Sequence, residues 1–151
     1  MAALSVIAAV IDKWASLTFL GKPAELYFDG IPLKTTTGVA QTLPSVNLID
    51  LGTTTSFDFE HNIVGEATTF QLIVRANTLL ECDQIGLGIK YNDAGIKASA
   101  GYDFGTLTFE NFENLQMVRQ SERRYREQDR DQSSLIVHRL ELTYEVQVQQ
   151  Q

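Results

Sequence analysis

Polar and apolar residues alternate most clearly near the end of the chain, from Ile136 to Val148. Every second position from Leu140 onward is apolar, and the positions between them are charged or polar. Because successive side chains of a strand point to opposite faces of a sheet, this pattern predicts a long strand with one buried and one solvated face. His138 falls on the apolar side, where we expect it to be hydrogen-bonded in or beside the core.

Shorter alternating stretches predict the other strands of a mainly antiparallel sheet. They are Ala24–Phe28, Val46–Leu51, Phe57 with Phe59, Thr69–Ala76 and Leu107–Val118. Asp29-Gly30 offers a tight turn that returns the first strand through Ile31 and Leu33. Phe57 and Phe59 are expected to be half buried and to pair, across a polar loop over 60–68, with the strand that holds Phe70. The stretches 34–42 and 92–105 lack a regular spacing of apolar residues and are expected to be loops.

Two stretches carry apolar residues at the spacing of a helix. The first, Ala3–Leu17, is followed by the helix-ending residues Gly21 and Pro23. The second follows a capping residue, Asn77 or Thr78, and ends near Tyr91. We therefore predict a single α+β domain over residues 1–151, with two helices packed on one face of the sheet.

A run of mixed charge separates the last two predicted strands. A strand over Leu135–Val148 would extend about 46 Å at about 3.3 Å per residue, whereas a compact chain of this length has a diameter of about 38 Å. We therefore predict a long C-terminal hairpin that projects from its own domain, with the charged run Arg119–Asp131 at its tip.

A projecting hairpin leaves backbone and side-chain groups without partners in its own chain. The fork-like guanidinium group of arginine is suited to bind the carboxylates of a neighbouring subunit. The candidate residues of such an inter-subunit interface are Arg119, Glu122, Arg123, Arg124, Tyr125, Arg126, Glu127, Asp129 and Arg130. Two other interpretations stay open. The run could be a solvated loop without a partner, or its arginines could bind nucleic acid, although the interleaved acidic residues weaken the positive field.

The order of these elements resembles that of the tail terminator, or tail completion, proteins of long-tailed bacteriophages. The resemblance covers nearly the whole chain. It is carried by Leu43-Pro44 before a strand ending Leu48-Ile49-Asp50-Leu51-Gly52, by the strand Phe70-Gln71-Leu72-Ile73-Val74-Arg75-Ala76, and by the ending Val137-His138-Arg139-Leu140-Glu141-Leu142-Thr143-Tyr144.

The resemblance implies a virion structural protein at the neck end of the tail, assembled in the host cytoplasm. Such proteins form a ring, usually a homohexamer, that caps the tail tube, ends its polymerisation and joins it to the head–tail connector. DNA passes through the ring only as cargo. The chain departs from the family in its Thr- and Gly-rich stretch 34–42 and in its strongly charged hairpin.

Two alternatives remain. One is a tail tube or neck subunit, which would also be a small sheet-rich ring former. The other, from a different class, is a monomeric module that binds a small ligand in a pocket. The residues expected to line that pocket are Tyr27, Phe57, Phe70 and Tyr144.

The composition of the chain also limits which functions we expect. The chain has 12 Lys and Arg against 19 Asp and Glu, a net charge of −7. Because affinity for phosphates comes mainly from Lys and Arg displacing counterions, we expect no specific nucleic-acid binding. The apolar opening residues 1–10 are interrupted by Asp12 and Lys13, so we expect neither a signal peptide nor a membrane span.

The candidate chemistry is sparse. The single cysteine, Cys82, excludes an internal disulfide and is expected to be buried. His61 lies near Asp58 and Glu60, but strand alternation separates it from them and indicates an ordinary surface residue. No phosphate-binding Gly-Lys-Ser/Thr motif occurs. We therefore expect no catalytic residue, no metal and no cofactor, and do not expect an enzyme.

Overall fold

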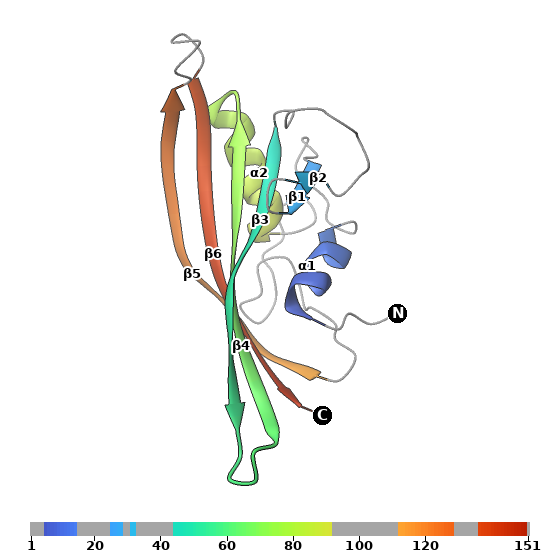
Figure 1. Cartoon of the computed structure of the whole chain (residues 1–151). Helices are drawn as coiled ribbons and strands as arrows, with labels where there is room; N and C mark the ends of the chain where they lie inside the picture. Colours follow the sequence, from blue (N-terminus) through green and yellow to red (C-terminus); the bar gives the residue numbers. More distant parts are fainter. Residues whose placement is uncertain are drawn as a thin grey trace.

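The computed structural model describes residues 5–14, 25–28, 31–32, 44–91, 112–128 and 136–150. The elements in chain order are α1 (Val6–Trp14), β1 (Glu25–Phe28), β2 (Ile31–Pro32), β3 (Ser45–Phe57), β4 (Ile63–Ala76), α2 (Leu79–Tyr91), β5 (Phe112–Gln128) and β6 (Ile136–Gln150). The strands form one six-stranded sheet in the order β2-β1-β3-β4-β6-β5. Both helices lie on the same side of this sheet (Figure 1). The predicted α+β class is confirmed.

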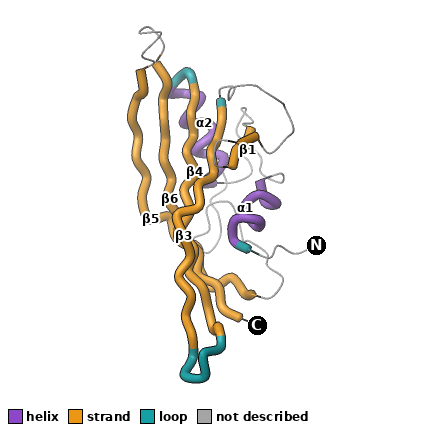
Figure 2. Tube along the Cα trace, in the orientation of Figure 1, coloured by secondary structure: helices purple, strands orange, loops and turns teal. Residues whose placement is uncertain are grey.

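Strand β4 is the centre of the sheet, because it is paired on both sides over most of its length (Figure 2). Both neighbours run antiparallel to it, and the only parallel pair among the described strands is β1 with β3. Phe70, Leu72 and Val74 of β4 have no exposed surface. They face the helices together, as the alternation predicts.

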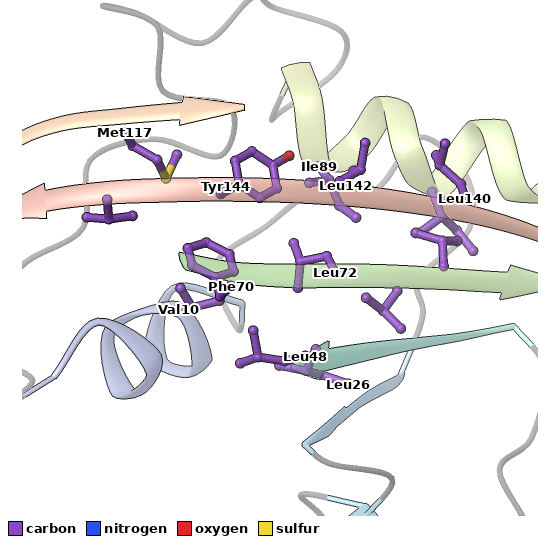
Figure 3. Packing of buried hydrophobic residues seen from close by; sticks show 14 of the residues in the cluster. Val10, Leu26, Leu48, Phe70, Leu72, Ile89, Met117, Leu140, Leu142 and Tyr144 are labelled. Carbon is purple, nitrogen blue, oxygen red and sulfur yellow. The ribbon is translucent and has the colours of Figure 1, made fainter. Parts of the chain in front are cut away.

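The core lies between this face of the sheet and the two helices (Figure 3). The ring of Phe70 stacks on that of Tyr144 in the neighbouring strand β6, with 5.3 Å between ring centroids and 22° between the ring planes. Helix α1 contributes Val10 and helix α2 contributes Ile85 to the same cluster. The alternation of β6 is confirmed, since its apolar side chains from Leu140 to Val148 are buried.

Helix α2 begins and packs as its sequence indicates. The hydroxyl oxygen of Thr78 accepts a hydrogen bond from the backbone N–H of Glu81 at 3.1 Å and so caps the helix. A Cβ atom at Gly86 would lie 2.6 Å from Cδ2 of Leu140, so the missing side chain lets the helix approach β6 closely. Cys82 is buried, as predicted, and burial raises the pKa of its thiol to about 11.

Several predicted boundaries are wrong. Helix α1 begins at Val6, later than the predicted Ala3, and its predicted end at Leu17 lies outside the described residues. Strand β3 is one continuous strand rather than two. Phe57 and Phe59 are exposed instead of half buried. The reason is that the core cluster includes Leu48 and Phe70 but no residue between them, so no described helix packs against the end of the β3–β4 hairpin.

Other predictions fall partly or wholly outside the described residues. The hairpin of β1 and β2 is confirmed as far as Pro32. Strand β4 begins at Ile63, so the polar loop expected over 60–68 is shorter than predicted. The stretches 34–42 and 92–105 lie outside the described residues, as does the first part of the strand expected over Leu107–Val118.

The long C-terminal hairpin is present, with 17 residues in β5 and 15 in β6. The charged run, however, is not at its tip as far as the structure describes it. Residues 119–128 belong to strand β5, and 129–131 lie outside the described residues. Strand β6 also remains paired with β4 as far as His138. The charged side chains therefore lie along a strand, where their neighbours in the same chain are fixed.

Two phenylalanines of this chain provide a matched test of the core. Replacing Phe70 with Ala should lower the free energy of unfolding by about 3 to 5 kcal/mol, because Phe70 is fully buried. Replacing Phe59, which is fully exposed, should change it by less than about 0.5 kcal/mol. Urea unfolding followed by circular dichroism measures both, and similar losses for the two variants would contradict this core.

Candidate subunit interface

Strand β5 is an edge of the sheet. Among the described residues it pairs only with β6, so its other side presents backbone N–H and C=O groups to the outside. A second open edge lies across the sheet, because β1 pairs with β3 only as far as Leu48. The remaining part of β3, from Ile49 to Phe57, has β4 as its only strand neighbour in the described structure. Open edges of this length are sites where a strand of another chain can pair.

A bulge in β5 decides which way the charged side chains point. The register with β6 shifts between Arg119 and Ser121, so an extra residue reverses the alternation. After the bulge, Arg124 lies opposite Leu140 and therefore shares the face covered by α2. Tyr125 lies opposite Arg139 and shares the other face, on which no described helix packs and which we call the open face.

On the helix side, ion pairs tie the edge strand to α2. Arg124 pairs with Asp83 of α2, and Nζ of Lys90 lies 2.9 Å from Oε1 of Glu122. Burial would raise the pKa of Glu122, but the hydrogen bond and charge of Lys90, with the charges of Arg119 and Arg124, outweigh it and lower that pKa.

On the open face, a second group of charged residues joins three strands. Nη1 of Arg139 lies 2.6 Å from Oε1 of Glu127, and its Nη2 lies 2.6 Å from Oε1 of Glu141. Nη2 of Arg75 lies 3.0 Å from the other oxygen of Glu127. The Tyr125 hydroxyl donates to Glu141, and the Arg139 guanidinium lies 5.0 Å from the centroid of the Tyr125 ring. We call Arg75, Tyr125, Glu127, Arg139 and Glu141 the open-face network.

Both carboxylates of the open-face network are held in their charged form. Burial alone would raise the pKa of Glu127, but hydrogen bonds and charge from Arg139 and Arg75 lower it below the ordinary value. Burial has the same effect on Glu141, where hydrogen bonds from Tyr125 and Arg139 again prevail and lower the pKa. The network therefore stabilises the fold through its charges.

These contacts reduce the number of predicted interface residues whose charge is free to bind a neighbouring subunit. Glu122, Arg124 and Glu127 already have partners in their own chain. Arg126 is exposed and makes no ion pair with any residue of the described structure. Asp129 and Arg130 lie outside the described residues. Arg123 is likewise exposed and makes no ion pair with a described residue, and its guanidinium lies 5.9 Å from the centroid of the Tyr125 ring. Among the described candidates, the charges of Arg123 and Arg126 are thus the ones available to a neighbour.

A hollow of about 400 Å³ lies between the start of α2 and the paired strands β5 and β6. The described residues that line it are Leu79, Cys82, Arg124, Tyr125, Arg126, His138 and Arg139. Of the four residues expected to line a small-ligand pocket, Tyr27, Phe70 and Tyr144 are buried in the core and Phe57 is exposed at the far end of β3. No sequence signal marked the hollow, because its lining comes from three separate elements.

The other exposed feature is the end of the β3–β4 hairpin, residues 57–64, which we call the arm tip (Figure 1). The side chains of Phe57, Phe59 and Val64 are 58%, 104% and 43% exposed. The turn is held by Asp58, whose Oδ1 accepts hydrogen bonds from the backbone N–H groups of Glu60 and Asn62 at 2.8 and 2.9 Å. The arm tip is therefore an ordered turn that presents apolar side chains to solvent.

No cluster of three or more His, Cys, Asp or Glu side chains that could hold a metal ion occurs in the described part of the chain. None of the described helices has the length and apolar character needed to cross a membrane. His61 is exposed beside the turn, as predicted. Neither protein-family models nor curated protein sequences gave a match to the chain.

The open-face network predicts a defined dependence of stability on pH. Since the pKa values of Glu127 and Glu141 are lowered on folding, their contribution is complete above the ordinary value of 4.5 and is lost as the pH falls through the lowered values. Replacing Arg139 with Met should cost about 1 to 3 kcal/mol at pH 7. It should also flatten the loss of stability below pH 4.5.

Urea unfolding between pH 7 and pH 3 measures both effects. Replacing Arg126, an exposed arginine that makes no ion pair with described residues, with Met is the matched control and should leave the pH profile unchanged. Equal profiles for all three proteins would contradict the role assigned to Arg139.

Proposed function

We propose that the chain is a virion structural subunit that docks to copies of itself in a ring, and that this ring caps a bacteriophage tail tube. The observation that carries the self-docking is the presence of two different open edges, β5 and the second half of β3, on opposite sides of one sheet. Contacts between two different surfaces of identical subunits are head-to-tail, and they close into rings when the rotation between copies permits.

The tail role rests on the resemblance in element order. In this proposal a ring of six copies forms in the host cytoplasm and ends up at the neck end of the tail. Its partners are the tail tube protein and the head–tail connector protein. The net charge of −7 suits a channel through which DNA passes as cargo, because like charges repel phosphate. No catalysis is part of this function.

The main alternative is a tail tube or neck subunit. The same head-to-tail contacts would serve it, but rings of a tube subunit would continue to stack. A monomeric small-ligand module is the more distant alternative, and the hollow of about 400 Å³ is the feature that supports it.

Assembly distinguishes these functions. We expect the purified chain to form closed rings, or to form them when tail tubes are added, in electron micrographs and in sedimentation velocity runs at tens of micromolar. Open-ended tubes formed by the chain alone would favour the tube subunit. A protein that stays monomeric both alone and with tail tubes would contradict the ring, and stabilisation of that monomer by a small molecule would favour the ligand module.

A further inference from the structure

Two features of the described structure, the arm tip and the hollow, are complementary in their apolar surfaces and charges. We infer that the arm tip of one copy, residues 57–64, fills the hollow beside β5 of the next copy. This contact rests on the proposed self-assembly and names the segment that occupies the predicted interface. The occupant is thus a second copy of this chain.

The apolar surfaces of the two features are complementary. At the arm tip, Phe57 and Phe59 project from an ordered turn into solvent. In the hollow, Leu79 and Cys82 of α2 supply an apolar wall, and the neighbouring Leu80 is 69% exposed. A volume of about 400 Å³ lies in the range of roughly 300 to 1,000 Å³ that pockets for organic ligands occupy. Aromatic side chains of this kind dominate the energetics of interfaces when they become buried.

The charges are complementary as well. The arm tip carries Asp58 and Glu60 beside its two phenylalanines, and both carboxylates are exposed. In the hollow, the charge of Arg124 is matched by Asp83 and Glu122, and that of Arg139 by Glu127 and Glu141. This leaves Arg126, with His138 beside it, to receive a carboxylate from the arm tip.

The chain cannot make this contact with itself. The arm tip lies at the start of β4, and Leu79 of the hollow follows the other end of that strand. Strand β4 has 14 residues, which at about 3.3 Å per residue separates the two features by about 46 Å. An arm tip can therefore enter only the hollow of another copy, and the contact is head-to-tail.

The test uses the full chain and one variant of each half of the contact. Phe59→Ser alters only the arm tip, and Arg126→Glu alters only the hollow. Each should weaken self-association by about tenfold or more in sedimentation velocity. Both side chains are exposed in the monomer, so its melting temperature should stay unchanged. Phe59→Tyr and Arg126→Lys keep the aromatic ring and the charge, and should associate like the original chain.

Mixing the two weakened variants tests the head-to-tail geometry. One variant keeps a good hollow and the other keeps a good arm, so an equal mixture should form a heterodimer that cannot grow further. Combining Glu60→Arg with Arg126→Glu in one chain should restore part of the association.

A cysteine trap extends the test to weak association. With Cys82 replaced by Ser, one preparation carries Glu60→Cys and the other carries Leu79→Cys. Oxidation of the mixture should give the disulfide-linked heterodimer in preference to either homodimer. Association that is untouched by Phe59→Ser and Arg126→Glu, with no preferred heterodimer, would overturn the arm contact while leaving self-assembly standing. Monomers in every sample, without cross-linking and with tail tubes present, would overturn both.

Discussion

The two ladders of β4, with β3 on one side and β6 on the other, determine how the rest of the molecule is built. In both ladders Phe70 and Leu72 of β4 lie opposite fixed partners in the neighbouring strands. A shift of one residue in the pairing would turn the apolar side chains of one strand to the open face. Burial of Phe70 against Tyr144 makes such a shift costly. The ladders thereby fix where the arm tip begins at one end of β4 and where α2 begins at the other.

The sequence predicted the elements whose alternation is uninterrupted. In β6 and in the second half of β4, apolar residues at every second position are buried, as expected. The same alternation gave a wrong prediction for Phe57 and Phe59, because it indicates which side chains share a face of the sheet and not whether another layer packs on that face. Among the described residues no helix packs on the hairpin beyond Leu48 and Phe70, and no local pattern in β3 could have indicated that.

The charged run shows a different limit. Because β5 is an edge strand, its side chains after Met117 need not be apolar, and the bulge near Arg119 interrupts what alternation remains. A charged strand was therefore mistaken for a hairpin tip. The sequence marked these residues as one charged group, but the partners they have within the chain, Asp83, Lys90, Arg75 and Glu141, come from other elements. The ion pair of Arg75 with Glu127 spans 52 residues of sequence, so only the fold could reveal it.

These charges also bear on how an open edge can serve assembly without indiscriminate pairing. Natural sheets protect their edges with charged side chains and bulges, and β5 has both. If a neighbouring strand offered only backbone groups, its pairing with β5 would remove water from Arg126 and the charged side chains beside it without giving them a new charged partner. That desolvation costs free energy. A neighbour that brings a carboxylate to Arg126 and an apolar side chain to Leu79 avoids that cost. In the proposed self-assembly, the specificity of docking should therefore come from side chains around the hollow, with backbone pairing along β5 following once the correct partner is in place.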